Sequence, residues 1–221
     1  DNMIRTYRYR VKDSSAAPRL NRWAQSVNRV WNFCNESQEH ALRWNQRWPT
    51  YQDLCKLTTG SSKELGLHSQ TVQAVCEQYA TRRQQFRKRK LRWRGRRSLG
   101  WIPFKAACVK VVDDTVRYVG HTFRFWKSRE LPGSIKCGSF SQDSRKRWYV
   151  NFVVEVPEAE AATGTRHMGI DLGLKTLATC SDGRKIEAPR WYRNQQRRIA
   201  EHQRKKRSRQ ARNLQAKIAN R

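Results

Sequence analysis

The stretch that decides the C-terminal fold is HMGIDLGLKTLATCSDG, residues 167–183. Its two apolar runs predict two short strands joined by a tight turn, and the turn at Asp182 leads to a third strand. Asp171 lies in the middle of the first strand, between Ile170 and Leu172. A carboxylate buried in an apolar strand is costly unless a partner stabilises its charge. The sequence therefore predicts a cationic partner for Asp171.

A divalent cation is one such partner. Mg²⁺ binds a few carboxylate oxygens and keeps its other positions for water and phosphate, so a carboxylate on a rigid strand suits it. Two such ions, about 4 Å apart, stabilise the attacking and leaving oxygens in phosphodiester hydrolysis. The nearby Gly169 and Gly173 leave room for a phosphate backbone. The alternative is that Asp171 caps a turn or pairs with a neighbouring lysine.

The overall charge points to a polyanionic partner. The 221 residues contain 47 Lys and Arg against 18 Asp and Glu, a formal charge of +29. Nucleic acid is the favoured partner, and a membrane surface is the competing one. No run approaches the about 18 apolar residues of a spanning helix, and the first residues lack the apolar core of a signal peptide. We therefore expect a cytoplasmic protein.

The cysteines give no sign of a metal or redox motif. Six are scattered along the chain without a C-x-x-C pair, which argues against a zinc knuckle in this sequence. Buried, reduced thiols are the expected state.

Two basic runs are candidates for nucleic-acid binding. Residues 82–110 contain 12 basic and no acidic residues, and residues 184–221 contain 14 basic and two acidic ones. Each cation that docks on a phosphate releases counterions and adds affinity rather than sequence choice. Trp93 and Trp101 lie among these cations and are expected to stack on unpaired bases. The alternative is a solvated face or a targeting tail. The residues predicted to contact nucleic acid are Arg87, Lys88, Arg89, Lys90, Arg92, Trp93, Arg94, Arg96, Arg97, Lys105, Lys175, Arg204, Lys205, Lys206, Arg207 and Arg209.

Hydrophobic periodicity predicts the remaining elements. Residues 3–12 alternate as a half-exposed strand does, whereas apolar residues recur every three or four positions between Leu20 and Cys34, as in an amphipathic helix that buries Trp23 and Trp31. Shorter helices follow at residues 50–57 and from Ser69. After Ser98, short β-branched and aromatic runs separated by turns predict a small antiparallel barrel or sandwich. The last residues predict one basic helix.

These motifs together resemble a known family. GIDLGLKTLATCSDG is similar to the first RuvC motif of the TnpB (OrfB) proteins of bacterial insertion sequences and of the related type V CRISPR effectors. MIRTYRYR resembles their opening strand, and RWYVNFVVEVPE the strand that closes their wedge domain. The helix with Gln70, Gln73 and Phe86 resembles their recognition lobe. Sugar-kinase and Hsp70 ATPases open with a similar strand, but hydroxyl residues follow it there, whereas this chain continues with Leu174 and Lys175.

The resemblance implies an α+β multidomain fold. A small antiparallel wedge β-barrel is split by a helical recognition lobe and is followed by the start of a ribonuclease-H-like RuvC domain. The implied boundaries are residues 1–12 and 96–160 for the barrel, 13–95 for the lobe, 161–165 for a linker and 166–221 for the incomplete RuvC domain.

The resemblance also implies a function, an RNA-guided DNA endonuclease with guide RNA and target DNA as partners. Such a protein reads a short target-adjacent motif, for which Gln70, Thr71 and Gln73 are the candidate residues, simple solvation being their alternative role. Asp171 is the one catalytic and metal-binding residue that carries over. The sequence ends before the later RuvC carboxylates and the zinc-binding C-x-x-C insertion, so the implied two-metal Mg²⁺ site is incomplete and Zn²⁺ belongs only to a part not contained here.

Two other functions stay open at this point. One is a catalytically inactive RNA-guided regulator, and the other is a generic basic RNA-binding protein such as one associated with ribosomes. The presence of Asp171 favours the nuclease, because a regulator has no need of a carboxylate in that strand. The family's setting implies a bacterial or archaeal cytoplasm in association with the nucleoid, without a membrane partner.

Overall fold

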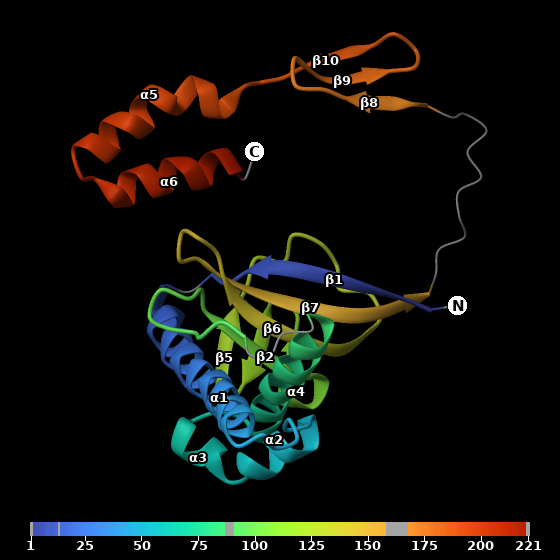
Figure 1. Ribbon diagram of the computed structural model, residues 1–221. Coiled ribbons are helices and arrows are strands. Elements are labelled where there is room, and N and C mark those ends of the chain that lie inside the picture. Colours follow the sequence, from blue (N-terminus) through green and yellow to red (C-terminus); the bar gives the residue numbers. More distant parts are fainter. Residues whose placement is uncertain (1, 13, 87–90, 158–167, 220–221) are drawn as a thin grey trace. The chain divides into compact units, whose positions relative to one another are not determined.

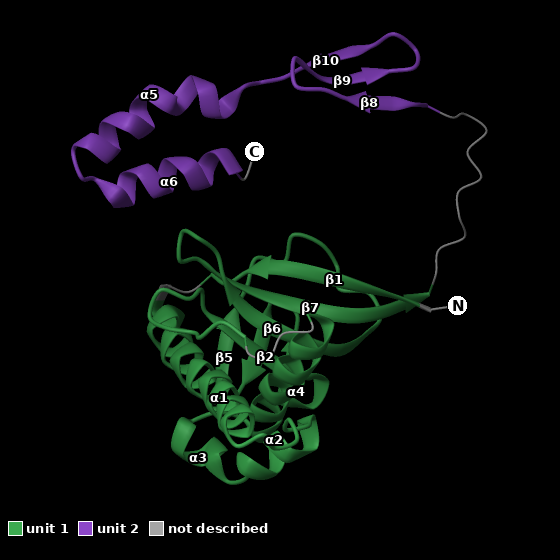
Figure 2. Ribbon diagram, in the orientation of Figure 1, with its two compact units in different colours: residues 1–158 green, residues 159–221 purple. Residues whose placement is uncertain are grey.

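The computed structural model divides into two compact units, residues 1–158 and 159–221 (Figures 1 and 2). It describes residues 2–12, 14–86, 91–157 and 168–219. Both units combine helices with antiparallel sheets, so the predicted α+β class is confirmed. The predicted linker lies outside the described residues.

The first unit contains two antiparallel sheets, a four-stranded one in the order β1-β7-β6-β2 and a three-stranded one in the order β3-β4-β5. The first consists of β1 (Asn2–Arg10), β2 (Trp101–Lys105), β6 (Ser134–Gln142) and β7 (Trp148–Pro157). The second consists of β3 (Val109–Val112), β4 (Thr115–Tyr118) and β5 (His121–Arg124). The predicted opening strand is confirmed, and it pairs with β7 from Asn2 to Arg10.

The two sheets meet where the chain continues past β1. Val11 forms an isolated antiparallel bridge with Phe125, and the N–H of Trp126 donates to the carbonyl of Arg10 at 2.8 Å. Each described sheet is open. The wedge barrel therefore stays a prediction.

Strict alternation along β7 determines which face of the large sheet is buried. Trp148, Val150, Phe152, Val154 and Val156 are buried, and the residues between them are partly exposed. Aromatic rings from neighbouring strands meet this face, since the centroids of Tyr9 and Phe152 lie 6.0 Å apart and those of Phe104 and Phe140 lie 5.6 Å apart. Burial of each large apolar side chain contributes about 1.5–3 kcal/mol.

Four helices complete this unit, namely α1 (Ala17–Arg43), α2 (Tyr51–Leu57), α3 (Ser61–Leu65) and α4 (Ser69–Gln85). The apolar stripe of α1 is buried as predicted, including Trp23 and Trp31. The helix predicted at residues 50–57 is confirmed as α2, where Thr50 and Asp53 form a capping box. Helix α3 was not predicted, and it begins after Gly60 and ends before Gly66, both in the left-handed region.

The helices and both sheets share one hydrophobic cluster. Trp23 of α1 packs edge-on against Tyr118 of β4 at 5.2 Å, and the Tyr118 hydroxyl lies 2.6 Å from the hydroxyl of Thr71 on α4. The proposed boundary between barrel and helical lobe therefore separates elements that have a common core.

The cysteines are free, as expected. Cys34, Cys76, Cys108 and Cys180 are buried, whereas Cys55 is half-buried and Cys137 is exposed. The prediction of buried thiols thus holds for most of them, and Cys137 departs from it because it lies on an exposed part of β6.

The second unit contains the three predicted strands in the order β10-β9-β8, namely β8 (Ile170–Leu172), β9 (Thr176–Cys180) and β10 (Lys185–Glu187). The prediction of one basic helix is wrong, because α5 (Trp191–Arg204) and α6 (Ser208–Ala219) form a hairpin (Figure 1). Lys206 takes a positive φ of 52° at the reversal. Folding back buries Ile199, Ala211 and Ala216, which a single solvated helix would leave exposed.

Candidate nucleic-acid interface and the position of Asp171

A loop at residues 91–99, called the basic loop below, is fixed along α1 by asparagine side chains. Asn35 donates to the carbonyl of Leu91 at 3.0 Å and accepts from its N–H at 3.2 Å. Asn32 donates to the carbonyl of Arg94 at 2.7 Å and accepts from the backbone N–H of Arg94 at 2.9 Å. An asparagine amide satisfies both groups of a peptide unit in this way, so two loop positions are held before any ligand binds.

A third asparagine holds the side chain of Arg94. The Nε of Arg94 donates to Oδ1 of Asn28 at 2.7 Å, and Nη2 donates to the carbonyl of Leu99 at 2.7 Å. Asn28, Asn32 and Asn35 are four and three residues apart, which places them on one face of α1. We call these three residues the asparagine ladder.

Arg94 itself is half-buried, unlike the other arginines of the loop. Its Cζ is 6.0 Å from the ring centroid of Trp31 and 5.7 Å from that of Trp101, within the range of cation–π attraction. Burial lowers the pKa of Arg94, and the nearby charge of Arg82 lowers it further. The sequence predicted Arg94 and Trp101 as nucleic-acid contacts, and in the structure they pack against each other.

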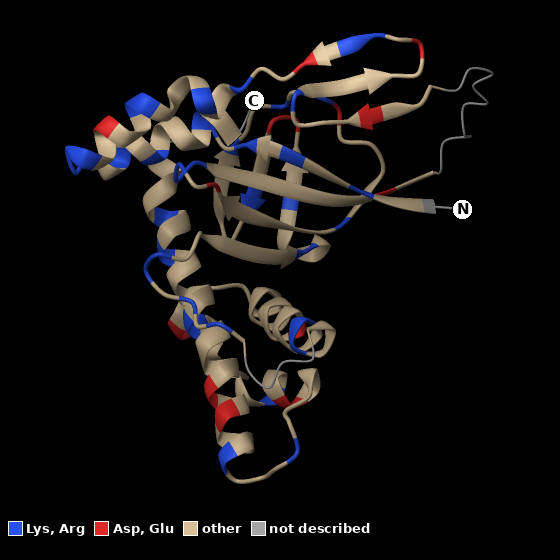
Figure 3. Ribbon diagram, turned by 45° about the horizontal axis from the view of Figure 1, so that its top comes forward, with Lys and Arg blue, Asp and Glu red and all other residues tan. Residues whose placement is uncertain are grey.

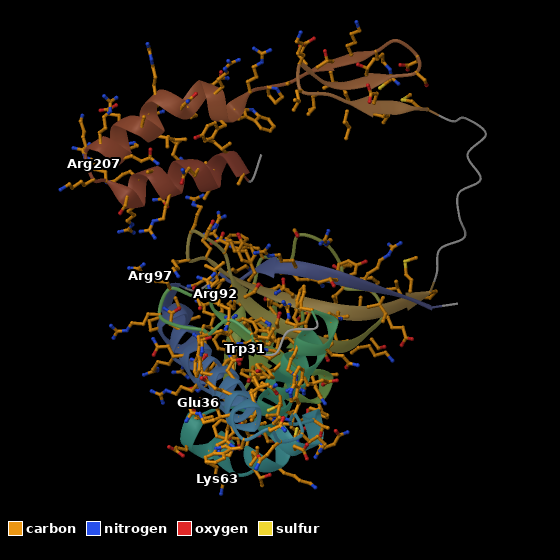
Figure 4. All side chains as sticks on the ribbon, in the orientation of Figure 1. Trp31, Glu36, Lys63, Arg92, Arg97 and Arg207 are labelled. Atoms are coloured by element: carbon orange, nitrogen blue, oxygen red, sulfur yellow. The ribbon has the colours of Figure 1, made fainter. Side chains whose placement is uncertain are left out.

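The other arginines of the basic loop point outward, as does Trp93. Arg92, Arg96 and Arg97 are exposed, and Trp93 keeps 43% of its surface accessible. Trp31 of α1, Arg92 and Arg97, labelled in Figure 4, line one groove, and Trp31 donates from Nε1 to the carbonyl of Arg92 at 3.1 Å. Within the described part of the chain, no ion pair involves the three arginines. Their charges are therefore available to a polyanion.

Two grooves run along the basic loop. The first, of about 890 Å³, lies between the loop and the end of α4 and is lined by Trp93 and by Phe86, which is 59% exposed. The second, of about 910 Å³, lies between the loop and α1 and is lined by Arg29, Arg96 and Lys146. Aromatic faces suit the stacking of unpaired bases, and the cation-lined groove suits a phosphate backbone.

Other predicted contacts of this unit lie elsewhere. Lys105 on β2 is 3.7 Å from the carboxylate of Glu77 and forms an ion pair with it. Arg87, Lys88, Arg89 and Lys90 lie outside the described residues.

The three candidates for reading a target-adjacent motif differ in exposure. Thr71 is fully buried, with its hydroxyl bonded to Tyr118. Gln70 is half-buried and accepts a hydrogen bond from the thiol of Cys108 at 3.3 Å. Only Gln73 among the three is exposed. The geometry therefore presents Gln73 to a ligand and keeps Thr71 in the core.

Asp171 lies at the centre of β8, opposite Thr179 of β9. The sequence predicted a buried apolar strand, but Asp171 is exposed, as are Ile170 at 60% and Leu172 at 75%. That expectation is wrong for this unit, because none of its described elements buries the side chains of β8. Its carboxylate is therefore solvated and needs no cation for stability.

The described residues contain no group of three metal-binding side chains, so Asp171 alone does not fit a two-metal site. Gly173 is required by the turn into β9, since a Cβ there would lie 2.9 Å from the carbonyl oxygen of Thr176. Lys175 is exposed on the same turn.

The second basic run forms the end of the helical hairpin. We call residues 204–209 the hairpin tip, and all of them are exposed. Lys205 forms an ion pair with Glu201 at 2.6 Å. In Figure 3 the lysines and arginines follow α5 and α6, so the hairpin presents cations along both of its helices.

The asparagine ladder was missed at the sequence level. Its sequence signal is three asparagines at positions 28, 32 and 35 on one helical face, next to the buried Trp31. Polar residues with helical spacing beside a buried stripe have to find partners, but the sequence does not name the loop that supplies them.

Within residues 2–12, 14–86, 91–157 and 168–219, the helices are too short or too polar to span a membrane.

Comparison with known proteins identifies a relationship. Residues 151–221 match the OrfB_IS605 family, described as "Probable transposase". A protein of Streptomyces pristinaespiralis named "Putative RNA-guided DNA endonuclease" is 26% identical over 213 residues. The alignment covers 90% of this chain and 52% of that protein, so the chain spans about half the length of this relative. Both findings support the TnpB (OrfB) family, and the resemblance predicted from the sequence is confirmed.

Proposed function

We propose that this chain, a relative of the TnpB (OrfB) proteins, holds guide RNA and target DNA in an RNA-guided DNA endonuclease. The observation that carries the proposal is the basic loop, which the asparagine ladder fixes with Arg92, Trp93, Arg96 and Arg97 facing outward. The name of the Streptomyces relative supports the same activity.

Fixing the loop before binding favours affinity. A loop that becomes ordered only on binding loses conformational freedom at that moment, and this cost is subtracted from the affinity. The basic loop has its backbone hydrogen-bonded to α1 already, so its cations meet phosphates without that cost. The first groove then receives unpaired bases on Trp93 and Phe86, and Gln73 is the exposed candidate for reading a target-adjacent motif.

Asp171 is the candidate catalytic residue of a Mg²⁺-dependent RuvC site in the complete protein. Its place in GIDLG supports this role, and so does the exposure of the apolar side chains around it. Ile170, Leu172 and Leu174 are 60%, 75% and 99% exposed, and exposed apolar side chains gathered on β8 and the turn after it favour a covering layer. We propose that such a layer carries the further carboxylates that Asp171 lacks here.

The first experiment tests nucleic-acid binding. The chain is purified at moderate ionic strength, and bound RNA is extracted and measured. We expect RNA of about a hundred nucleotides to co-purify with the chain. Neutralising its formal charge of +29 takes more phosphates than a short duplex carries. A preparation that is free of nucleic acid and fully stable to heat contradicts the proposal.

The second experiment tests Asp171 in the complete protein that contains this chain. We expect Asp171→Ala to abolish Mg²⁺-dependent DNA cleavage and leave RNA binding intact. Asp171 is exposed, so the melting temperature in chelator should not fall. Glu187→Ala is the matched control, because Glu187 is an exposed carboxylate on β10 of the same sheet.

The cleavage results separate the nuclease from the inactive regulator. Cleavage by the parent that Asp171→Ala removes supports the nuclease. RNA-guided DNA binding without cleavage in the parent favours the inactive regulator, and an Asp171→Ala protein that still cuts contradicts the catalytic role.

A further inference from the structure

The outer face of the four-stranded sheet carries a cluster of side chains that the basic loop does not include. Along β1, Tyr9 points into the core, while Arg8 and Arg10 are exposed. Arg10 pairs with Tyr149 of β7, and Arg8 pairs with Asn151. Because cross-strand partners share a face, these four side chains lie together on the outside of the sheet.

Arg8 and Tyr149 form a stacked pair. The Cζ of Arg8 lies 3.9 Å from the ring centroid of Tyr149, the distance of direct contact between a guanidinium and an aromatic face. We call these two residues the Arg8 stack. The described residues contain no carboxylate paired with Arg8, so its charge is met by no acidic group on the protein.

The tyrosine of this stack is held from its other end. Its hydroxyl donates to Oδ2 of Asp143 at 3.3 Å, and Nε of Arg147 donates to the same oxygen at 2.7 Å. Asp143 also accepts from the N–H groups of Arg145 and Arg147 at 2.9 and 2.8 Å. The single carboxylate of this cluster is thus already engaged by the turn between β6 and β7, and it orients Tyr149 without neutralising Arg8.

The same turn connects this face with the basic loop. Lys146, on the turn, lines the second groove together with Arg29 of α1 and Arg96 of the basic loop. Arg147 and Tyr149 lie one and three positions after Lys146 in the chain. A nucleic-acid strand that occupies the second groove therefore reaches the Arg8 stack by crossing this one turn of the protein.

We infer that the Arg8 stack binds an unpaired nucleotide of the strand that occupies the second groove. Its base stacks on the free face of the Arg8 guanidinium, whose other face lies on Tyr149, and Arg10 meets the adjoining phosphate. Guanidinium planes and aromatic rings both stack on unpaired bases, whereas bases inside a duplex do not offer their faces. The inference rests on the proposed nucleic-acid function and adds a second, base-contacting surface to it.

The test separates base stacking from charge. Arg8→Lys keeps the positive charge and removes the planar group, and Tyr149→Leu removes the ring beneath it. The matched control is Arg117→Lys, because Arg117 is an exposed strand arginine on β4 of the other sheet. Each protein is titrated with a fluorescent oligoadenylate of about 12 nucleotides and with an abasic ribose-phosphate oligomer of the same length.

We expect Arg8→Lys and Tyr149→Leu to weaken oligoadenylate binding by about fivefold or more, the lower end of the effect of one stacked base. Binding of the abasic oligomer should not change for Arg8→Lys, and Arg117→Lys should behave as the parent for both. Tyr149→Phe, which keeps the ring, should bind almost as the parent does. Melting curves of the variants confirm that they are folded.

Two outcomes overturn the inference. If Arg8→Lys binds oligoadenylate as tightly as the parent, no base stacks there. If it loses affinity equally for both oligomers, the effect is one of phosphate contact or of folding. A parent that binds neither oligomer contradicts the proposed function itself, which is a different result from a tight-binding parent whose Arg8 variants are unchanged.

Discussion

The basic loop and the hairpin tip are two surfaces of similar charge and different construction. Residues 91–99 include four arginines without an acidic residue, and residues 204–209 include five cations without one. In the loop, side chains of α1 bind the backbone, and Arg94 is packed between two tryptophans. In the tip, the cations project from helix ends, and Lys205 pairs with Glu201 of the same helix.

This difference separates two ways in which cations contribute to binding. The cations of the tip are exposed, so they add an electrostatic attraction to phosphate that salt screens. Those of the loop depend on the folded structure that positions them, so that uncharged residues of α1 affect the affinity as well. Substitutions at the two surfaces should therefore differ in their effects on the free energy of unfolding, on the salt dependence of binding and on the preference for unpaired strands.

The largest expected effect is the combined replacement of Arg204, Lys205, Lys206 and Arg207 by alanine. Each phosphate contact adds about 0.7 to the log-log salt slope on a single strand, so four lost contacts lower it by up to about 2.8 and weaken binding more than about a hundredfold near 0.1 M salt. The free energy of unfolding should hardly change, because the four side chains are exposed. Affinity measured against salt concentration checks this. Lost affinity with an unchanged slope means that the tip acts through folding.

The next effect is that of Arg94→Met, which removes the guanidinium but keeps a long side chain. It leaves Oδ1 of Asn28 and the carbonyl of Leu99 without their donors, and hydrogen bonds from a charged donor contribute about 1.5–3 kcal/mol each. We expect urea unfolding to show a loss of about 3 kcal/mol or more. Unchanged stability with a smaller salt slope shows instead that Arg94 contacts phosphate, as its sequence position suggested.

Local patterns predicted much of this fold. Alternation located β1 and β7, helical spacing located α1 and α4, and turn residues separated the three short strands of the second unit. The charge count located both basic surfaces. Each of these properties is written in neighbouring residues, so a single sequence carries it.

Properties that depend on distant partners were not predictable in this way. Arg94 appears in a basic run, and only the fold brings Asn28 and Trp31 of α1 and Trp101 of β2 near it. The turn at Lys206 contains neither glycine nor proline, so no helix-breaking residue in the sequence marks the end of α5 and the start of α6. The exposure of Asp171 follows from the small size of its sheet, which its own apolar neighbours do not reveal.

A smaller effect is expected of Asn32→Ala, which removes no charge. It breaks two hydrogen bonds to the loop backbone at Arg94, and each is typically worth about 1 kcal/mol. We expect nucleic-acid affinity to fall while the salt slope stays constant, the reverse of the relation at the hairpin tip. Ser37→Ala, at a half-buried position of the same helix, is the control. If the salt slope falls with Asn32→Ala, the loop of the variant has lost phosphate contacts and is not merely less ordered.

The smallest effect is that of Trp93→Leu, which tests whether the loop does more than supply charge. Trp93 is 43% exposed and lines the first groove, so its loss should weaken binding of an unpaired strand by about fivefold, with little change for a duplex or in stability. The control is Trp44→Leu, since Trp44 is 64% exposed in a segment, residues 33–66, with four acidic and four basic residues. A tryptophan in a neutral surrounding attracts no polyanion, so this variant should bind as the parent does. Equal losses for single strand and duplex mean that Trp93 shapes the loop and does not stack on bases. Equal losses for both tryptophan variants mean that Trp93 contributes no more than an exposed tryptophan outside the basic loop.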